Sequence, residues 1–198
     1  MRHVSILKRN SLNKMIKKHI KTILKEMESV LSQVKEDQIK ELVDVIPDKN
    51  KIVLVGAGRV GLAVRGFAMR LGHLGLNSHM IGDATVPSIG KGDLLIVASG
   101  SGETETIFQL VKIAKKNKAH VALITGNPES RMGKLADIIV ELRAPSKTKD
   151  VKGLKSAQPM TTLNEQSLVI LFDALVLRLM EEMNETHDTM WGRHSNLE

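Results

Sequence analysis

Residues 93–105 have the sequence Asp-Leu-Leu-Ile-Val-Ala-Ser-Gly-Ser-Gly-Glu-Thr-Glu. The apolar run at Asp93–Val97 has the length of one strand, and a polar loop follows it at Ala98–Glu105. Beyond this loop the apolar residues recur at helical spacing, at Ile107, Leu110, Val111 and Ala114. The stretch therefore predicts a buried strand, a tight loop and a helix.

The loop has the composition of an anion-binding site. Its glycines let backbone N–H groups approach a ligand, its hydroxyls add donors, and a helix N-terminus favours negative charge. No Gly-x-x-x-x-Gly-Lys-Ser/Thr string occurs in the chain, so a nucleotide P-loop is not expected. We expect a seat for a phosphate or another small anion. The alternative is a flexible turn in which Ser101 or Thr104 only caps the helix.

The composition limits the chemistry. The 198 residues include no cysteine, which excludes disulfides, thiolate metal ligands and a cysteine nucleophile. The seven histidines show no metal-ligand spacing. We therefore expect no metal site.

Charge and hydropathy limit the partners. The net charge of +7 suits anionic partners, but aromatic residues make up only 2% of the chain and leave little to stack on bases. A small phosphorylated substrate is thus favoured over nucleic acid. The basic N-terminus is followed by no apolar signal segment, and no membrane span is visible. We expect a soluble, cytoplasmic protein.

Residues 1–46 are predicted to form an N-terminal helical arm ahead of a domain at 47–198. An apolar stripe runs from Val4 to Val34 with lysines on the other face, and a second short helix is expected at about Asp37–Val45. The stripe must be buried against another surface. We therefore hypothesise a homo-oligomer.

The rest of the chain alternates strands and helices. Besides the central strand, strands are expected at Lys51–Val55, near Asn77–Ile81, at His120–Ile124 and at Ile138–Leu142. Helices are expected up to about Leu71, after the central loop and, briefly, at Arg131–Ala136. This pattern predicts an α/β fold, a flavodoxin-like five-stranded parallel sheet of order 2-1-3-4-5 between helices. In that order the loops after the first and third strands face one crevice.

The loop after the first strand carries Gly-x-Gly-x-x-Gly at 56–61, so a dinucleotide fold must be considered. Asp83 could imitate the ribose-binding acid, but it lies farther along the chain than the usual separation of about 20 residues. Nicotinamide binding is therefore a minor alternative.

The C-terminal part begins with an aperiodic loop at 144–158. Gln-Pro-Met-Thr-Thr-Leu-Asn-Glu-Gln at 158–166 then opens a long helix with a broad apolar face, and Thr189–Glu198 forms a tail.

Several of these motifs together resemble a known family. Ser-Gly-Ser-Gly-Glu-Thr at 99–104 is similar to the phosphosugar loop of sugar isomerase (SIS) domains. Within that group the chain resembles the 6-phospho-3-hexuloisomerases. The features that carry this resemblance are Gly-Ala-Gly-Arg at 56–59, Phe-Ala-Met-Arg-Leu-Gly-His at 67–73, the segments 87–96 and 158–165, and Arg-His-Ser-Asn-Leu-Glu at 193–198.

The resemblance implies an isomerase that interconverts 3-hexulose 6-phosphate and fructose 6-phosphate in the ribulose monophosphate route of formaldehyde handling, and it implies a tetramer. One departure is Val60, where the family usually has a serine whose hydroxyl helps to hold the substrate. The implied substrate-binding residues are Gly58, Arg59, Ser99, Gly100, Ser101, Gly102, Glu103 and Thr104.

Moving a carbonyl from C3 to C2 through a cis-enediol needs one base and no cofactor. The resemblance assigns that base to Glu165. The alternative is a capping box at Thr162–Glu165, in which Glu165 only bonds back to the helix start. The resemblance also implies a catalytic role for His194, in ring opening or proton transfer. The alternative is that His194 is a solvent-exposed residue of the tail without a catalytic role.

Other functions stay open at this point. The crevice could serve a non-catalytic sugar-phosphate sensor, for which Val60 is the argument, or an isomerase of a pentose phosphate. A dehydrogenase is the last alternative. No helix-turn-helix segment that would suit a DNA-binding regulator is recognisable.

Overall fold

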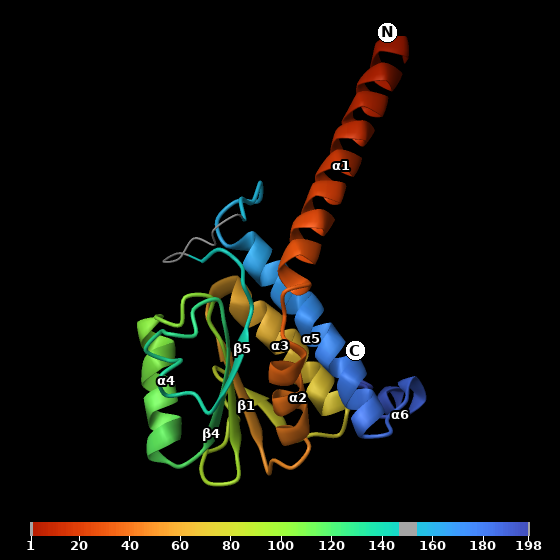
Figure 1. The fold of residues 1–198 in the computed structure, drawn as a ribbon. Coiled ribbons are helices and arrows are strands. Elements are labelled where there is room, and N and C mark those ends of the chain that lie inside the picture. The colour runs from red at the N-terminus through yellow and green to blue at the C-terminus, as the bar shows by residue number, and fades with distance from the viewer. Residues whose placement is uncertain (1, 147–153, 198) are drawn as a thin grey trace.

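The computed structural model describes residues 2–146 and 154–197, with side chains described from residue 15 onward. Its centre is a parallel sheet with strand order β2-β1-β3-β4-β5, as the alternation of elements predicts (Figure 1). The strands are β1 Ile52–Gly56, β2 Ser78–Met80, β3 Leu94–Ala98, β4 His120–Thr125 and β5 Ile138–Glu141.

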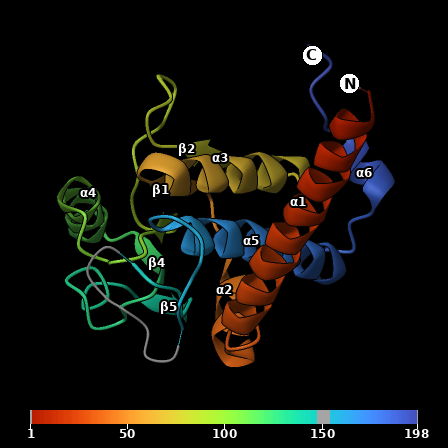
Figure 2. The same cartoon turned by 90° about the horizontal axis from the view of Figure 1, so that it is seen from above.

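Helices cover both faces of this sheet. Seen from above, α4 lies on one side of the strands, and α3 and α5 lie on the other (Figure 2). The order of strands places β1 next to β3, which is the point where the chain reverses direction across the sheet. The helices are α1 Arg2–Leu31, α2 Glu36–Val45, α3 Gly58–His73, α4 Glu105–Lys116, α5 Thr162–Glu182 and α6 His187–Trp191.

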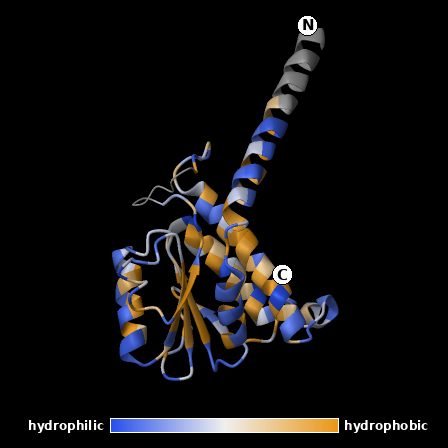
Figure 3. Ribbon diagram, in the orientation of Figure 1, coloured by the Kyte–Doolittle hydropathy of each residue, from blue (hydrophilic) through white to orange (hydrophobic). Residues whose placement is uncertain are grey.

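The strands are buried on both faces, which explains why they are continuous apolar runs. In β1, Leu54 packs into the core under α3 and α5, whereas Val53 packs into the core under α4. The hydrophobic residues accordingly gather in the strands (Figure 3). Between α3 and α5, the rings of Phe67 and Phe172 stack with centroids 4.4 Å apart. This stack fixes α5, and with it the residues at its N-terminus, against α3.

The N-terminal helices differ in how they are packed. Leu42 and Ile46, at and just after the end of α2, are fully buried in the same core as Phe67. By contrast, α1 projects from the body of the molecule (Figure 1), and it ends at Leu31, earlier than the predicted stripe. Across residues 2–146 and 154–197, no helix combines the length and apolar character that crossing a membrane needs.

The short helix predicted at Arg131–Ala136 is wrong: the segment is a series of turns. Gly133, a poor helix former, lies so close to Pro128 that a Cβ on it would be 1.8 Å from the Pro128 carbonyl oxygen. The Met132 N–H donates to the Gly102 carbonyl at 3.3 Å instead of continuing a helix. These turns therefore support the loop after β3.

Of the loop predicted at 144–158, residues 147–153 lie outside the described residues.

Candidate active site

A cleft of about 450 Å³ opens at the carboxyl ends of β1 and β3, where the strand order predicts it. This size suits a small ligand. Seven of the predicted site residues line it together: Gly58, Arg59, Ser99, Gly100, Ser101, Thr104 and Glu165. Its other lining residues are Ala57, Val60, Ala98, Ile107, Ser146, Pro159, Met160, Thr161, Thr162 and Asn164.

Three helix N-termini meet at this cleft. The N-cap residues are Ala57 of α3, Thr104 of α4 and Thr161 of α5, and all three line the cleft. None of them makes a side-chain capping hydrogen bond, so the first N–H groups of each helix are not covered by a cap. The positive ends of three helices in one place make a site for an anion.

The loop after β3 is held in shape from within. The Gly102 N–H donates to the carbonyl and the hydroxyl oxygen of Ser99 at 3.1 and 3.2 Å, and the Glu103 N–H donates to Ser101 Oγ at 3.2 Å. Gly102 has a φ of +65°, and a Cβ on it would lie 2.0 Å from Ser130 Oγ. Glycine is therefore required there. Thr104 is the N-cap residue of α4, as the alternative expects, but its side chain makes no capping hydrogen bond.

Glu103 does not line the cleft, although it was predicted with the binding residues. Its carboxylate accepts hydrogen bonds from the Arg131 N–H at 2.9 Å and from Arg131 Nε at 2.7 Å. These two bonds, the one from the backbone N–H first, hold the pKa of Glu103 below its ordinary value. Its contacts therefore tie the loop to the turns at Arg131.

Glu165 lies at the start of α5 with its side chain only 13% exposed. Its Oε1 accepts a hydrogen bond from Thr161 Oγ1 at 2.7 Å, and its Oε2 lies 2.9 Å from Nη1 of Arg59 on α3. The alternative of a capping box at Thr162–Glu165 is wrong, because the N-cap is Thr161, one residue earlier. The Thr162 hydroxyl donates instead to the Pro159 carbonyl at 2.7 Å.

The two oxygens of Glu165 differ in their environment. Oε2 is buried and, within the described residues, accepts no hydrogen bond, because the ion pair with Arg59 does not align an N–H on it. Arg59 Nη1 donates to Thr162 Oγ1 at 3.1 Å. A carboxylate oxygen without a hydrogen-bond donor, held beside a cation at the edge of an anion site, is placed to accept a proton from a bound molecule.

Comparison with known proteins identifies the family to which the chain belongs. The model of the SIS domain matches residues 46–172. The chain is 38% identical to the 3-hexulose-6-phosphate isomerase of Bacillus subtilis, covering 91% of this chain and 97% of that protein. The chain belongs to the SIS domain family.

Two further comparisons agree with this membership. The 3-hexulose-6-phosphate isomerase of Mycobacterium gastri is 37% identical, over 92% of each chain. A crystal structure of a hypothetical protein from Methanococcus jannaschii superposes with a TM-score of 0.78 at 31% identity, covering 91% of this chain and 99% of that one. That structure is described as inferring a molecular function of 3-hexulose-6-phosphate isomerase.

His194 is not in the cleft of this SIS domain. Its ring lies 5.3 Å from that of His73, at the C-terminal end of α3, whereas Arg59 and the cleft are at the N-terminal end. Because a helix rises 1.5 Å per residue, Arg59 and His73 are about 21 Å apart along α3. Within one chain the structure therefore does not bring His194 together with Glu165.

The glycine pattern at 56–61 serves the packing of the SIS domain. A Cβ on Gly61 would lie 2.7 Å from the carbonyl oxygen of Gly56, so the third glycine lets α3 start close to the end of β1. Asp83 pairs with Arg65 at 2.9 Å and does not line the cleft. Neither feature supports a dinucleotide site.

Sequence reasoning missed four polar residues that line the cleft. Thr161 and Thr162 lie in the motif at 158–165. The structure shows that Thr161 donates to Glu165 and that Thr162 accepts from Arg59. Asn164 is buried against Gly100, where a Cβ would lie 3.2 Å from its Oδ1. The Ser146 hydroxyl is buried without a hydrogen bond in the described residues, and no sequence signal marks it.

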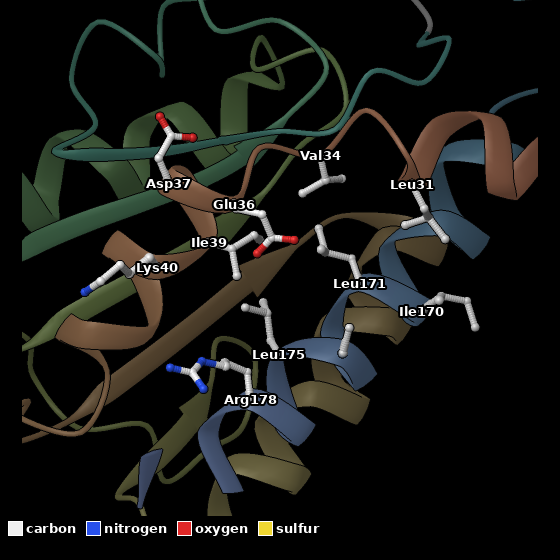
Figure 4. Close-up of a pocket in the computed structure, with 11 residues that line it drawn as sticks. Leu31, Val34, Glu36, Asp37, Ile39, Lys40, Ile170, Leu171, Leu175 and Arg178 are labelled. Carbon is white, nitrogen blue, oxygen red and sulfur yellow. The ribbon is translucent and has the colours of Figure 1, made fainter. Parts of the chain in front are cut away.

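A larger hollow of about 650 Å³ lies between α2 and α5, where Ile39, Leu171 and Leu175 lie close together (Figure 4). It also includes Glu36 and Asp37 in the first turn of α2, whose negative charges disfavour an anion at that helix N-terminus. The lining of this hollow therefore suits an anion less well than the lining of the cleft at β1 and β3.

Proposed function

We propose that this protein interconverts 3-hexulose 6-phosphate and fructose 6-phosphate through a cis-enediol intermediate. The observation that carries the proposal is the place of Glu165: its Oε2, buried and without a hydrogen bond in the described residues, lies where three helix N-termini meet. The names of the relatives support the choice of the sugar substrate. The residues of the cleft support a binding site for its phosphate and a catalytic base.

The proposed chemistry is a proton transfer between neighbouring carbons. Glu165 removes the proton from C2 of 3-hexulose 6-phosphate and returns a proton to C3, while the hydroxyl proton moves from O2 to O3. The products are fructose 6-phosphate and the regenerated carboxylate. The phosphate is held by the loop of Ser99, Ser101 and Thr104.

Arg59 has two roles in this mechanism. Before the transfer its guanidinium is paired with the Glu165 carboxylate at 2.9 Å. When Glu165 takes the proton, its negative charge passes to the enediolate oxygen. The same cation then stabilises that oxygen, because it is already fixed beside the site of charge development.

The finer parts of the proposal concern the assembly and the setting. We propose a homotetramer, supported by the exposed apolar side chains of α1 and by the tail, whose His194 needs a neighbouring copy to reach a cleft. We also propose a cytoplasmic enzyme of the ribulose monophosphate pathway, acting in formaldehyde handling. The two relatives named 3-hexulose-6-phosphate isomerase support the reaction itself.

The test replaces Glu165 by Gln and measures turnover of enzymatically generated 3-hexulose 6-phosphate. Because a general base contributes about 10²- to 10⁴-fold, kcat should fall by that factor. Fructose 6-phosphate should still raise the melting temperature of the variant, since the phosphate loop is unchanged. Asp173→Asn, an exposed carboxylate on the same helix, is the control and should keep wild-type kcat.

Two outcomes would contradict the proposal in different ways. Turnover that survives Glu165→Gln would show that Glu165 is not the base. A wild type that shows no turnover, yet is stabilised by fructose 6-phosphate, would indicate a sugar-phosphate sensor, the reading that Val60 favours.

A further inference from the structure

The carboxylate of Glu26, on α1, holds the segment that leads into the cleft. Ser156 Oγ and Gln158 Nε2 donate hydrogen bonds to Oε2 at 2.7 and 3.0 Å, and the Ala157 N–H donates to Oε1 at 2.7 Å. Three consecutive residues thus bond to one side chain that lies about 130 positions earlier in the chain.

This contact needs an ionised carboxylate. An ionised Glu is an acceptor only, with room for all three donors on its two oxygens. Burial raises the pKa of Glu26, but the bonds from Ala157, Gln158 and Ser156 together outweigh it and leave the pKa below its ordinary value. The carboxylate is therefore ionised at neutral pH, and its hydrogen bonds are of the stronger, charge-assisted kind.

The segment held by Glu26 continues directly into the cleft. After Gln158 come Pro159, whose carbonyl accepts from Thr162 Oγ1, and Met160, with a φ of +55°. A non-glycine residue in this left-handed region persists only where its surroundings hold it. Met160 is 89% exposed, so its own side chain is not held by packing. The Thr162 N–H closes the turn by donating to the Pro159 carbonyl at 3.2 Å, and further contacts hold the turn at its two ends.

The two ends of this turn are anchored differently. On the C-terminal side, α5 begins, and the Thr161 hydroxyl bonds to Glu165 Oε1 at 2.7 Å. On the N-terminal side, and within the described part of the chain, residues 156–158 bond to Glu26, and the Gln158 N–H also donates to Ser156 Oγ. Glu26 does not itself line the cleft.

We propose that Glu26 is a positioning residue, which fixes the catalytic base Glu165 through the segment 156–161. This inference rests on the proposed function. It gives the N-terminal helix a part in the reaction: α1 supplies the side chain that keeps Thr161, and through it Glu165 Oε1, in place.

The experiment replaces Glu26 by Gln and compares it with Glu28→Gln, an exposed residue two positions away on the same helix. The variant keeps the size of the side chain. However, one carboxylate oxygen, which accepts hydrogen bonds, is replaced by an NH₂ group, which can only donate and therefore faces another donor. We expect kcat to fall at least about tenfold. KM for the sugar phosphate should stay within about threefold, because the loop at 99–104 is untouched. Glu28→Gln should change neither quantity.

A second measurement separates positioning from a general loss of stability. Hydrogen exchange of the Ala157 amide, whose N–H donates to Glu26, should speed up in Glu26→Gln, and exchange in the strands of the sheet should not. Glu26→Asp, which keeps the charge one methylene farther away, should recover part of kcat.

Three results would overturn the inference. They are a kcat of Glu26→Gln equal to that of Glu28→Gln, Ala157 exchange at the wild-type rate, and a loss of kcat matched by faster exchange throughout the sheet. Absence of turnover in the wild type is distinguishable from all three: it would remove the proposed function, and the positioning role with it.

Discussion

Val60 is half-buried at the start of α3 and lines the cleft beside Arg59. Its isopropyl group offers no hydrogen-bond donor to a substrate, where the resemblance implies a serine. It also packs against the apolar core. At this position a gain in ligand binding therefore has to be weighed against a loss of packing.

Replacing Val60 by Ser should lower KM for the sugar phosphate by about two- to tenfold, since one ordinary hydrogen bond contributes roughly 0.5–1.5 kcal/mol. Steady-state kinetics of the wild type and the variant would measure this. Val60→Ala is the matched control, because it removes the same methyl groups without adding a hydroxyl. Equal KM values for the serine and alanine variants would contradict the prediction.

At the scale of elements, Asp137 connects α4, β4 and β5. It lies one residue before β5, and its carboxylate accepts from Lys115 Nζ of α4 at 2.6 Å and from the Val121 N–H of β4 at 2.8 Å. Burial raises the pKa of Asp137, but these two bonds outweigh it and leave the pKa below its usual value of 3.8. The ionised carboxylate therefore stabilises the fold at neutral pH.

The sign of the pH dependence follows from this lowered pKa. The stabilisation is present above the unfolded value of 3.8 and is lost as pH falls through the still lower folded pKa. Asp137→Asn should lower the free energy of unfolding by about 1 kcal/mol at pH 7. The amide keeps an acceptor for the Val121 N–H but loses the ion pair with Lys115.

Urea unfolding at pH 7 and at pH 3 would measure the effect of Asp137→Asn. The difference from wild type should shrink at the lower pH. The exposed Asp48→Asn is the control and should match wild type at both pH values. A deficit of the same size at both pH values would mean that the Asp137 charge does not contribute.

At the scale of the whole molecule, α1 projects from the body (Figure 1), and several of its apolar side chains are exposed. Ile16, Ile20 and Leu24 are 53, 49 and 55% exposed, and their four-residue spacing puts them on one face of the helix. In the proposed oligomer this face is covered by another copy.

Replacing both Ile20 and Leu24 by Lys should therefore reduce the assembly to smaller species in sedimentation velocity, because charges would be buried at the contact. The matched control replaces Lys21 and Lys25, which lie together elsewhere on α1, by Ser and should leave the assembly intact. A double lysine variant that sediments like the wild type would show that α1 is not the contact. A monomeric wild type would remove the oligomer itself.

Local pattern was enough to predict the sheet and the loop after β3. Apolar runs such as 94–98 and the spacing of Ile107 and Val111 are properties of neighbouring residues, and they fix strand and helix by the geometry of burial alone. The helix expected at 131–136 was predicted incorrectly. There the outcome depends on contacts with distant segments, such as the Met132 N–H with the Gly102 carbonyl.

Short-range sequence patterns were sufficient to predict the parallel α/β fold, the crevice between the first and third strands, and a loop at 99–104 whose composition suits an anion. These follow from periodicity and from the direction of helix dipoles, which act over a few residues. Which charged side chains lie together became visible only in the folded structure. It paired Arg59 with Glu165, tied Glu26 to residues 156–158 and placed His194 at the far end of α3. Such contacts join residues more than 100 positions apart, and they depend on how whole helices pack.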